Sequence, residues 1–90
     1  GMEGPAFWML DAQGKEAGGC CVSANLRDWG RVGLMALERG AVPGGQIATA
    51  RWFESATSQM VDFPENDRGY GAQWWTRGDG AQFEASGIFG

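Results

Sequence analysis

Few side chains in this sequence can serve as a nucleophile or as its base. Serine stands at positions 23, 55, 58 and 86, the single lysine is Lys15, and histidine is absent. Histidine is the commonest general base and the commonest zinc ligand, so chemistry that depends on it is excluded. Asp62, Glu65 and Asp67 could act in acid–base chemistry, but they lie in a polar segment where a solvated turn is the ordinary outcome. We therefore expect neither a metal nor a cofactor.

The two cysteines are neighbours, Cys20 and Cys21. Adjacent cysteines rarely bridge each other, and two cysteines alone do not complete a four-ligand zinc site. The pattern favours two small, buried apolar residues at the edge of a strand. An intermolecular disulfide and a redox role are the alternatives.

The charge distribution argues against two classes of partner. The formal net charge is −4, and the basic residues are scattered along the chain. Because no basic patch exists to bind phosphates, we expect no nucleic-acid partner. No apolar run approaches the roughly 18 residues that span a bilayer, and the start lacks the pattern of a secretory signal, so we expect no membrane partner. Gly1 ahead of Met2 is interpreted as a remnant of tag removal.

The chain is short but rich in aromatic residues. Its 90 residues include five Trp, five Phe and one Tyr. A chain of this size buries only about 60% of the surface that it exposes when unfolded, while each such ring can bury roughly 150–250 Å². Either the core is unusually aromatic, or some rings belong to a surface that these residues do not complete.

The clearest predicted element is a helix over residues 26–39. Asn25 and Asp28 resemble a capping box, and Gly40 is typical of the residue that follows a helix. Gly30 and Gly33 are expected to permit close approach of another backbone, with tolerated glycine as the alternative. We expect the face at helical spacing to be buried against an antiparallel sheet, namely Leu26, Trp29, Val32, Gly33 and Leu37.

The remaining segments predict short strands and a second helix. A second helix is expected near 49–58, with Thr49 as its cap. The other expectations are a strand over 7–11 with a hairpin partner over 18–22, a turn over 42–46, a loop over 61–69, and strands over 70–77 and 82–89 around the hairpin signal at 78–80. This order predicts an α+β fold in one domain over residues 1–90, with two helices packed on an antiparallel sheet.

Several motifs, taken in order along the chain, resemble those of one enzyme family. The run from Asn25 to Gly33 is similar to an S/T-x-x-D-L-A-R-F-G helix start. Tyr70-Gly71-Ala72-Gln73-Trp74-Trp75 is similar to a Y-G-x-x-W-W strand, and Phe83–Gly90 to the strand that leads into G-I/V-F/Y-G. Further matches are Gly40, Gly44, Gln46-Ile47 and Trp52. Together these motifs resemble the class C β-lactamase-like serine hydrolases, especially the branch of 6-aminohexanoate-dimer hydrolases and esterases, and the resemblance covers the chain from about Phe7 to Gly90.

The resemblance implies a penicillin-binding-like transpeptidase fold and chemistry by a Ser-x-x-Lys nucleophile with a Tyr-x-Asn/Ser element. Neither is present, because no serine is followed three residues later by lysine and Tyr70 is followed by Gly-Ala. The family's Lys-Thr-Gly-like triplet falls on Ala85-Ser86-Gly87, which would line the substrate cleft. The backbone N–H of Ile88 would then be a catalytic oxyanion-hole donor. An ordinary edge-strand glycine and a core isoleucine are the alternatives for Gly87 and Ile88.

The departures from the family pattern narrow the expected activity. In this resemblance, Ala85 replaces a lysine that helps to hold the carboxylate of a β-lactam. The loss of that lysine favours ester or amide hydrolysis over β-lactam hydrolysis in the full-length protein. Trp74 and Trp75 should face opposite sides of a strand, either as core or as a wall of the substrate cleft.

Two functions follow from this pattern, and a third, a standalone enzyme, is disfavoured because the nucleophile and its base are missing. The first is the C-terminal portion of a serine hydrolase that is inactive without the N-terminal part of its domain. The second is a small, self-standing binding or assembly module on the same scaffold. The ending Gly-Ile-Phe-Gly lacks a polar tail, which favours truncation. Unpaired strand edges and uncovered aromatic rings predict a homodimer, formed by edge pairing, face packing or exchange of a terminal strand.

Overall fold

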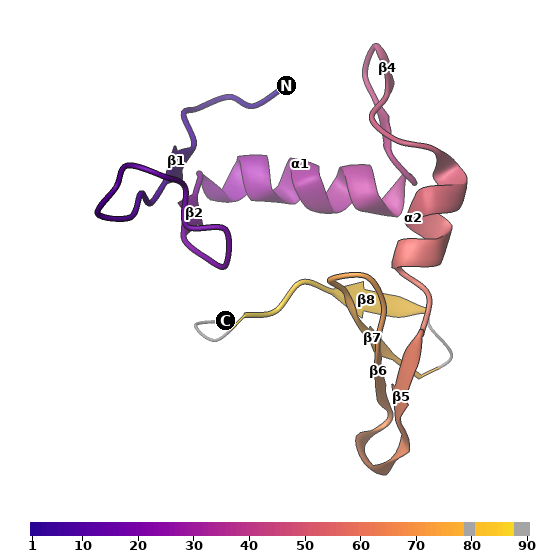
Figure 1. The fold of residues 1–90 in the computed structure, drawn as a ribbon. Coiled ribbons are helices and arrows are strands. Elements are labelled where there is room, and N and C mark those ends of the chain that lie inside the picture. The colour runs from indigo at the N-terminus through magenta and orange to yellow at the C-terminus, as the bar shows by residue number, and fades with distance from the viewer. Residues whose placement is uncertain (79–80, 88–90) are drawn as a thin grey trace. The chain divides into compact units, whose positions relative to one another are not determined.

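The structure is a computed structural model that describes residues 1–78 and 81–87. The chain divides into two compact units, Gly1–Leu37 and Glu38–Gly90, each described here by itself. Two helices and several antiparallel strand pairs make up the described part, so the predicted α+β class is confirmed (Figure 1). Organisation as a single domain over residues 1–90 stays a prediction. No helix among the described residues has the length and apolar character needed to cross a membrane.

The N-terminal unit contains one short strand pair and the longer helix. Strand β1 (Phe7–Trp8) pairs antiparallel with β2 (Val22–Ser23), and a single bridge joins Leu10 to Glu16. The hairpin partner expected over 18–22 is therefore present, although it consists only of Val22, the last residue of that range, and Ser23 just beyond it. Helix α1 (Leu26–Leu37) follows after two residues.

Helix α1 begins as its capping pattern predicts. The Asp28 backbone N–H donates to Asn25 Oδ1 at 2.8 Å, which satisfies a group that lacks an intrahelical partner. The helix ends at Leu37, two residues before the predicted end at residue 39. Arg39 and Gly40 have φ angles of 54° and 86°, and this left-handed backbone cannot continue a right-handed helix.

The N-terminal unit does not cover the face of α1 that is predicted to be buried, and burial of that face against an antiparallel sheet stays a prediction. Leu26 is 86% exposed and Leu37 65% exposed, and Trp29, Val32 and Gly33 are exposed as well. Within its own unit, the strands available to cover the helix are two residues long. A Cβ placed on Gly30 or Gly33 would meet nothing within 4 Å, so no other backbone of the N-terminal unit approaches these two glycines closely.

The C-terminal unit opens with a tight hairpin and the second helix. Strands β3 (Ala41–Val42) and β4 (Gly45–Gln46) flank Pro43 and Gly44, and Gly44 has a φ of 93°, as the predicted turn requires. Helix α2 (Ala50–Ala56) follows. Its predicted cap is confirmed, because the Trp52 backbone N–H donates to Thr49 Oγ1 at 3.2 Å.

A four-stranded antiparallel sheet completes this unit. The strands β5 (Val61–Phe63), β6 (Arg68–Tyr70), β7 (Trp75–Arg77) and β8 (Gln82–Glu84) pair in chain order (Figure 1). A 3₁₀ turn, η1 (Pro64–Asn66), joins β5 to β6. The register aligns Val61, Tyr70, Trp75 and Glu84 across the sheet.

Two predictions in this region are wrong. The loop expected over 61–69 contains β5, η1 and the start of β6, because the turn formers occupy only its middle. The single strand expected over 70–77 is two strands separated by a reversal. There the Gly71 backbone N–H donates to the Trp74 carbonyl at 2.7 Å, and Gln73 has a left-handed φ of 71°. The last strand ends at Glu84, and residues 88–89 of its predicted range lie outside the described residues.

The buried part of the C-terminal unit lies where α2 meets the sheet. Phe53 and Ala56 of α2 are buried, together with Gly69, Gly71 and Thr76. The Ala72 backbone N–H donates to the Ala56 carbonyl at 2.8 Å. A Cβ on Gly71 would lie 2.2 Å from that same carbonyl oxygen, so only glycine allows this approach. Gly78 begins the predicted hairpin with a φ of 58°, and Arg77 pairs with Gln82.

Candidate functional site

The triplet Ala85-Ser86-Gly87 lies directly after β8, and all three residues are exposed. The triplet is held to the sheet at Ser86, whose carbonyl accepts a hydrogen bond from Trp75 Nε1–H at 3.3 Å. A Cβ on Gly87 would meet nothing within 4 Å. Ile88, the predicted oxyanion-hole donor, lies outside the described residues. The described triplet is therefore anchored to the sheet through its backbone and open on its outer side.

Trp75 is the centre of an aromatic and charged cluster on one face of the sheet. Its ring centroid lies 4.9 Å from that of Tyr70, nearly perpendicular to it, and 6.1 Å from that of Phe63. The Arg68 guanidinium carbon stands 4.6 Å from the Trp75 ring centroid, a cation–π distance. Arg68 also donates to Glu84 Oε1 at 2.8 Å. The strand period of two places all these side chains on one face.

Trp74 belongs to the opposite face. Its ring lies edge-on to Phe83, with centroids 5.2 Å apart. Phe83 pairs with Thr76, whereas Glu84 pairs with Trp75, so Phe83 and Trp75 point to different sides of the sheet. The expectation that the two tryptophans face opposite sides is confirmed. Both are half-buried, and both make packing contacts.

The described structure does not assemble a nucleophile and its base. Ser58 Oγ donates to the Ser55 carbonyl at 2.7 Å, as helix-end serines commonly do. Asp62 accepts a hydrogen bond from Gln59 Nε2 at 2.7 Å, which gives this carboxylate a structural partner. In residues 1–78 and 81–87, no group of three or more His, Cys, Asp or Glu side chains could hold a metal ion.

Asp28 is fully buried, and its contacts extend beyond the predicted helix start. Its two oxygens accept from the backbone N–H groups of Glu3 at 2.8 Å and Gly4 at 3.0 Å. They also accept from Asn25 Nδ2 at 2.7 Å and Arg31 Nη1 at 2.8 Å. A carboxylate with four donors is fully satisfied, so Asp28 holds the N-terminal segment to α1 and is not available as a base. The Asn-x-x-Asp-x-x-Arg spacing was the available signal.

The same contacts set the ionisation of this cluster. The hydrogen bond from the Glu3 N–H, with smaller contributions from Gly4 and Arg31, lowers the pKa of Asp28 although burial opposes this. The hydrogen bond and charge of Glu3 raise the pKa of Arg31, with Asp28 contributing in the same direction. Arg31 Nη2 contacts Glu3 Oε1, and Arg27 Nε lies 3.2 Å from Glu3 Oε2. The lowered pKa of Asp28 and the raised pKa of Arg31 both favour the charged forms of this ion pair.

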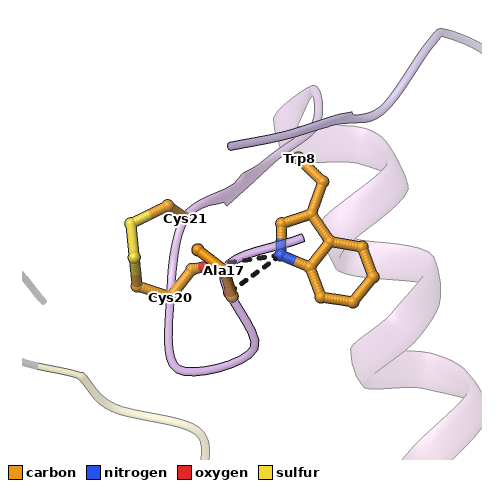
Figure 2. Close-up of a disulfide and its surroundings, with 4 residues drawn as sticks. All are labelled: Trp8, Ala17, Cys20 and Cys21. Carbon is orange, nitrogen blue, oxygen red and sulfur yellow. Dashed lines mark hydrogen bonds between the residues drawn. A yellow bond between two sulfur atoms is a disulfide. The ribbon is translucent and has the colours of Figure 1, made fainter. Parts of the chain in front are cut away.

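The cysteine prediction is wrong, because Cys20 and Cys21 form a disulfide with each other and both are exposed. The Cys20 backbone N–H donates to the Ala17 carbonyl at 3.1 Å, so the loop turns sharply just before the pair. In Figure 2 the two sulfur atoms project from this loop on the side away from the Trp8 ring. Cys20 and Cys21 therefore face solvent and are not buried at the edge of a strand.

Comparison with known proteins finds a partial match to a curated hydrolase. The chain is 38% identical over 69 residues to the 6-aminohexanoate-dimer hydrolase of Paenarthrobacter ureafaciens. The match covers 64% of this chain and 17% of the hydrolase, so the chain spans a small part of that protein's length. No family model and no solved structure matches. The match supports a relationship to β-lactamase-like hydrolases, which is the coarse form of the predicted resemblance.

Proposed function

We propose that this chain is the C-terminal portion of a β-lactamase-like serine hydrolase that cleaves ester or amide bonds as a whole protein. The observation that carries the proposal is the 38% identity over 69 residues to a hydrolase of which the match covers only 17%. A serine hydrolase of this kind needs a Ser-x-x-Lys nucleophile, which the 90 residues lack. In this proposal the nucleophile belongs to the part of the protein that precedes these residues.

The role proposed for these residues is to form one wall of the substrate cleft. Ala85, Ser86 and Gly87 would border the substrate, and the Ile88 backbone N–H would stabilise the oxyanion. The Trp75 indole, by donating to the Ser86 carbonyl, keeps this segment against the sheet. Because Ala85 stands where a lysine would bind a β-lactam carboxylate, β-lactams are not the proposed substrates.

A chimeric enzyme tests this proposal. In the hydrolase of P. ureafaciens, the matched segment is replaced by the corresponding residues of this chain, and hydrolysis of nitrophenyl esters and of the 6-aminohexanoate dimer is measured. Retained hydrolysis of either substrate is expected. A second chimera with Gly87→Val should lose at least tenfold in kcat/KM, because its side chain would enter the space proposed for substrate. A folded but inactive first chimera, judged by circular dichroism, would contradict the proposal.

We also expect the isolated chain to have no hydrolase activity. Incubation with nitrophenyl esters, a chromogenic cephalosporin and a short amide oligomer should give only background rates. Stoichiometric labelling of a serine by a fluorophosphonate would instead show an activated nucleophile within these 90 residues. That result would overturn the assignment of the nucleophile to another part of the protein.

A second candidate, a self-standing assembly module, is favoured by one observation. Exposed apolar side chains run along α1, including Leu26, Leu34 and Leu37. Contiguous exposed apolar side chains commonly mark a protein–protein interface. In this proposal the chain forms a homodimer, and its oligomeric state is the measurement that separates the two candidates.

A further inference from the structure

The Cys20–Cys21 disulfide is a chemical feature that the proposed hydrolase role does not use. We propose that it is a thiol–disulfide exchange site for dithiol reductants, with Trp8 coupled to its redox state. The inference does not depend on the proposed function, because it concerns a different unit of the chain and different chemistry.

Access is the first argument. Both cysteines are exposed, and the residues before them, Gly18 and Gly19, carry no side chains that could shield the sulfur atoms. A Cβ on either glycine would meet nothing within 4 Å. Exchange requires a thiolate to reach one sulfur atom along the S–S direction, which buried structural disulfides prevent. This pair is open to such an attack.

The backbone around the pair supplies the second argument. Cys21 has a φ of 79°, in the left-handed region that residues with a Cβ seldom adopt. The bond between the two side chains holds the intervening peptide in this arrangement. Once the sulfur atoms separate, the Cys21 φ is free to return to negative values. Reduction therefore releases a strained backbone, which favours the reduced form.

Trp8 links this backbone change to β1. Its indole Nε1–H donates to the Ala17 carbonyl at 3.1 Å and to the Cys20 carbonyl at 3.1 Å (Figure 2). The Cys20 carbonyl is part of the peptide group that joins the two cysteines. Rotation about the Cys21 φ angle turns this peptide group, and the carbonyl turns with it. The Cys21 carbonyl in turn accepts from the Met9 backbone N–H at 3.1 Å. A rotation at Cys21 must therefore change the environment of the Trp8 indole.

The reaction is a two-electron exchange. A thiolate of the reductant attacks one sulfur atom of the pair, the Cys20–Cys21 bond breaks, and a mixed disulfide forms while the other cysteine leaves as a thiolate. The second thiolate of the reductant then attacks the reductant's own sulfur in the mixed disulfide, which closes the reductant's disulfide and releases the remaining cysteine as a thiolate. The products are the two cysteine thiols, which take up two protons, and the oxidised reductant in disulfide form.

Mass spectrometry under native conditions tests the exchange. Untreated protein should take up no iodoacetamide, and after treatment with 1 mM dithiothreitol it should take up two groups, at Cys20 and Cys21. Two groups on untreated protein, or a disulfide-linked dimer on a non-reducing gel, would overturn the proposal. So would a pair that dithiothreitol reduces only after the protein is unfolded in guanidinium.

Fluorescence tests the coupling to Trp8. Reduction of the wild-type chain should change tryptophan emission measurably, and reoxidation should restore it. The change should disappear in Trp8→Phe, which leaves the disulfide intact, and in the double variant Cys20→Ser/Cys21→Ser. An equal change in Trp8→Phe would assign the signal to another tryptophan and overturn the proposed coupling. No change in wild type, with reduction verified by mass, would do the same.

Discussion

Asn25 and Asp28 hold each other through two reciprocal hydrogen bonds at the start of α1. The Asp28 backbone N–H donates to Asn25 Oδ1 at 2.8 Å, and Asn25 Nδ2 donates to Asp28 Oδ2 at 2.7 Å. One bond caps the helix, and the other satisfies a buried carboxylate. The pair therefore joins local helix formation to the attachment of the N-terminal segment, since Asp28 also accepts from Glu3 and Gly4.

Removal of the cap should destabilise the chain. Asn25→Ala loses both bonds, and a lost cap alone costs about 1 kcal/mol in the free energy of unfolding. Asn25→Ser is the matched control, because its hydroxyl can cap the helix but cannot replace the amide that donates to Asp28. The expected order of urea midpoints is wild type, Asn25→Ser, Asn25→Ala. An unchanged midpoint in Asn25→Ala would contradict the role of this side chain.

Acidification should lower the stability of the N-terminal unit, because it protonates the Asp28 carboxylate. Its pKa is lower in the folded chain than the ordinary value of about 3.9, chiefly because the Glu3 N–H donates to the carboxylate. The unfolded state then binds the proton more tightly, so acidification favours unfolding. This contribution to stability is complete above about pH 4 and is lost as the pH falls through the folded pKa.

Urea midpoints measured between pH 7 and pH 2 test this dependence. Asp28→Asn should be less stable than wild type at pH 7, because a neutral amide accepts more weakly from Arg31 and carries one donor group where an acceptor is needed. The gap between the two proteins should narrow below pH 4. A gap that stays constant over this range would show that Asp28 ionisation does not contribute.

Glycine-to-alanine substitutions should change the stability of the chain in opposite directions at two positions. At Gly71, a Cβ would lie 2.2 Å from the Ala56 carbonyl oxygen and 2.6 Å from that of Ser58, so Gly71→Ala should cost about 1–3 kcal/mol or more. At Gly30, inside α1, a Cβ would meet nothing within 4 Å, so Gly30→Ala should stabilise by about 0.5–1 kcal/mol. Thermal midpoints of both variants decide this, and a loss of stability in Gly30→Ala would indicate a close neighbour of α1.

The helix starts were predictable because their signals are local. Asn25 and Thr49 each cap a backbone N–H three residues later, and such contacts depend on a short stretch of chain. Strand β5 was not predicted, because it is only three residues long and Pro64 follows it directly. Three residues are too few to show the alternation of apolar and polar side chains by which a strand is recognised.

The candidate sites were less accessible to sequence reasoning because they depend on distant contacts. The Glu3 N–H reaches Asp28 across 25 residues, and Trp75 reaches the Ser86 carbonyl across 11. No pattern within a helix or strand encodes such pairings. The resemblance predicts a triplet at 85–87, but it does not predict that the Trp75 indole donates a hydrogen bond to the backbone of this segment.

Self-association is the prediction that bears most directly on the competing functions. The apolar residues of α1 repeat at helical spacing, yet Leu26 and Leu37 remain largely exposed. Exposed apolar stripes of this kind seldom persist on a soluble monomer, so we propose that two copies associate with two-fold symmetry. Light scattering at micromolar concentration should then give the mass of a dimer.

The double variant Leu26→Lys/Leu37→Lys tests which surface is used. Two charges on α1 should shift the measured mass towards the monomer without lowering the helical signal, because neither side chain is buried in the described structure. Gln13→Lys, on an exposed turn, is the control and should stay dimeric. A dimer that survives the double variant would direct attention to the edges of the four-stranded sheet. A wild-type monomer that unfolds cooperatively would contradict the homodimer and remove the observation that favours an assembly module.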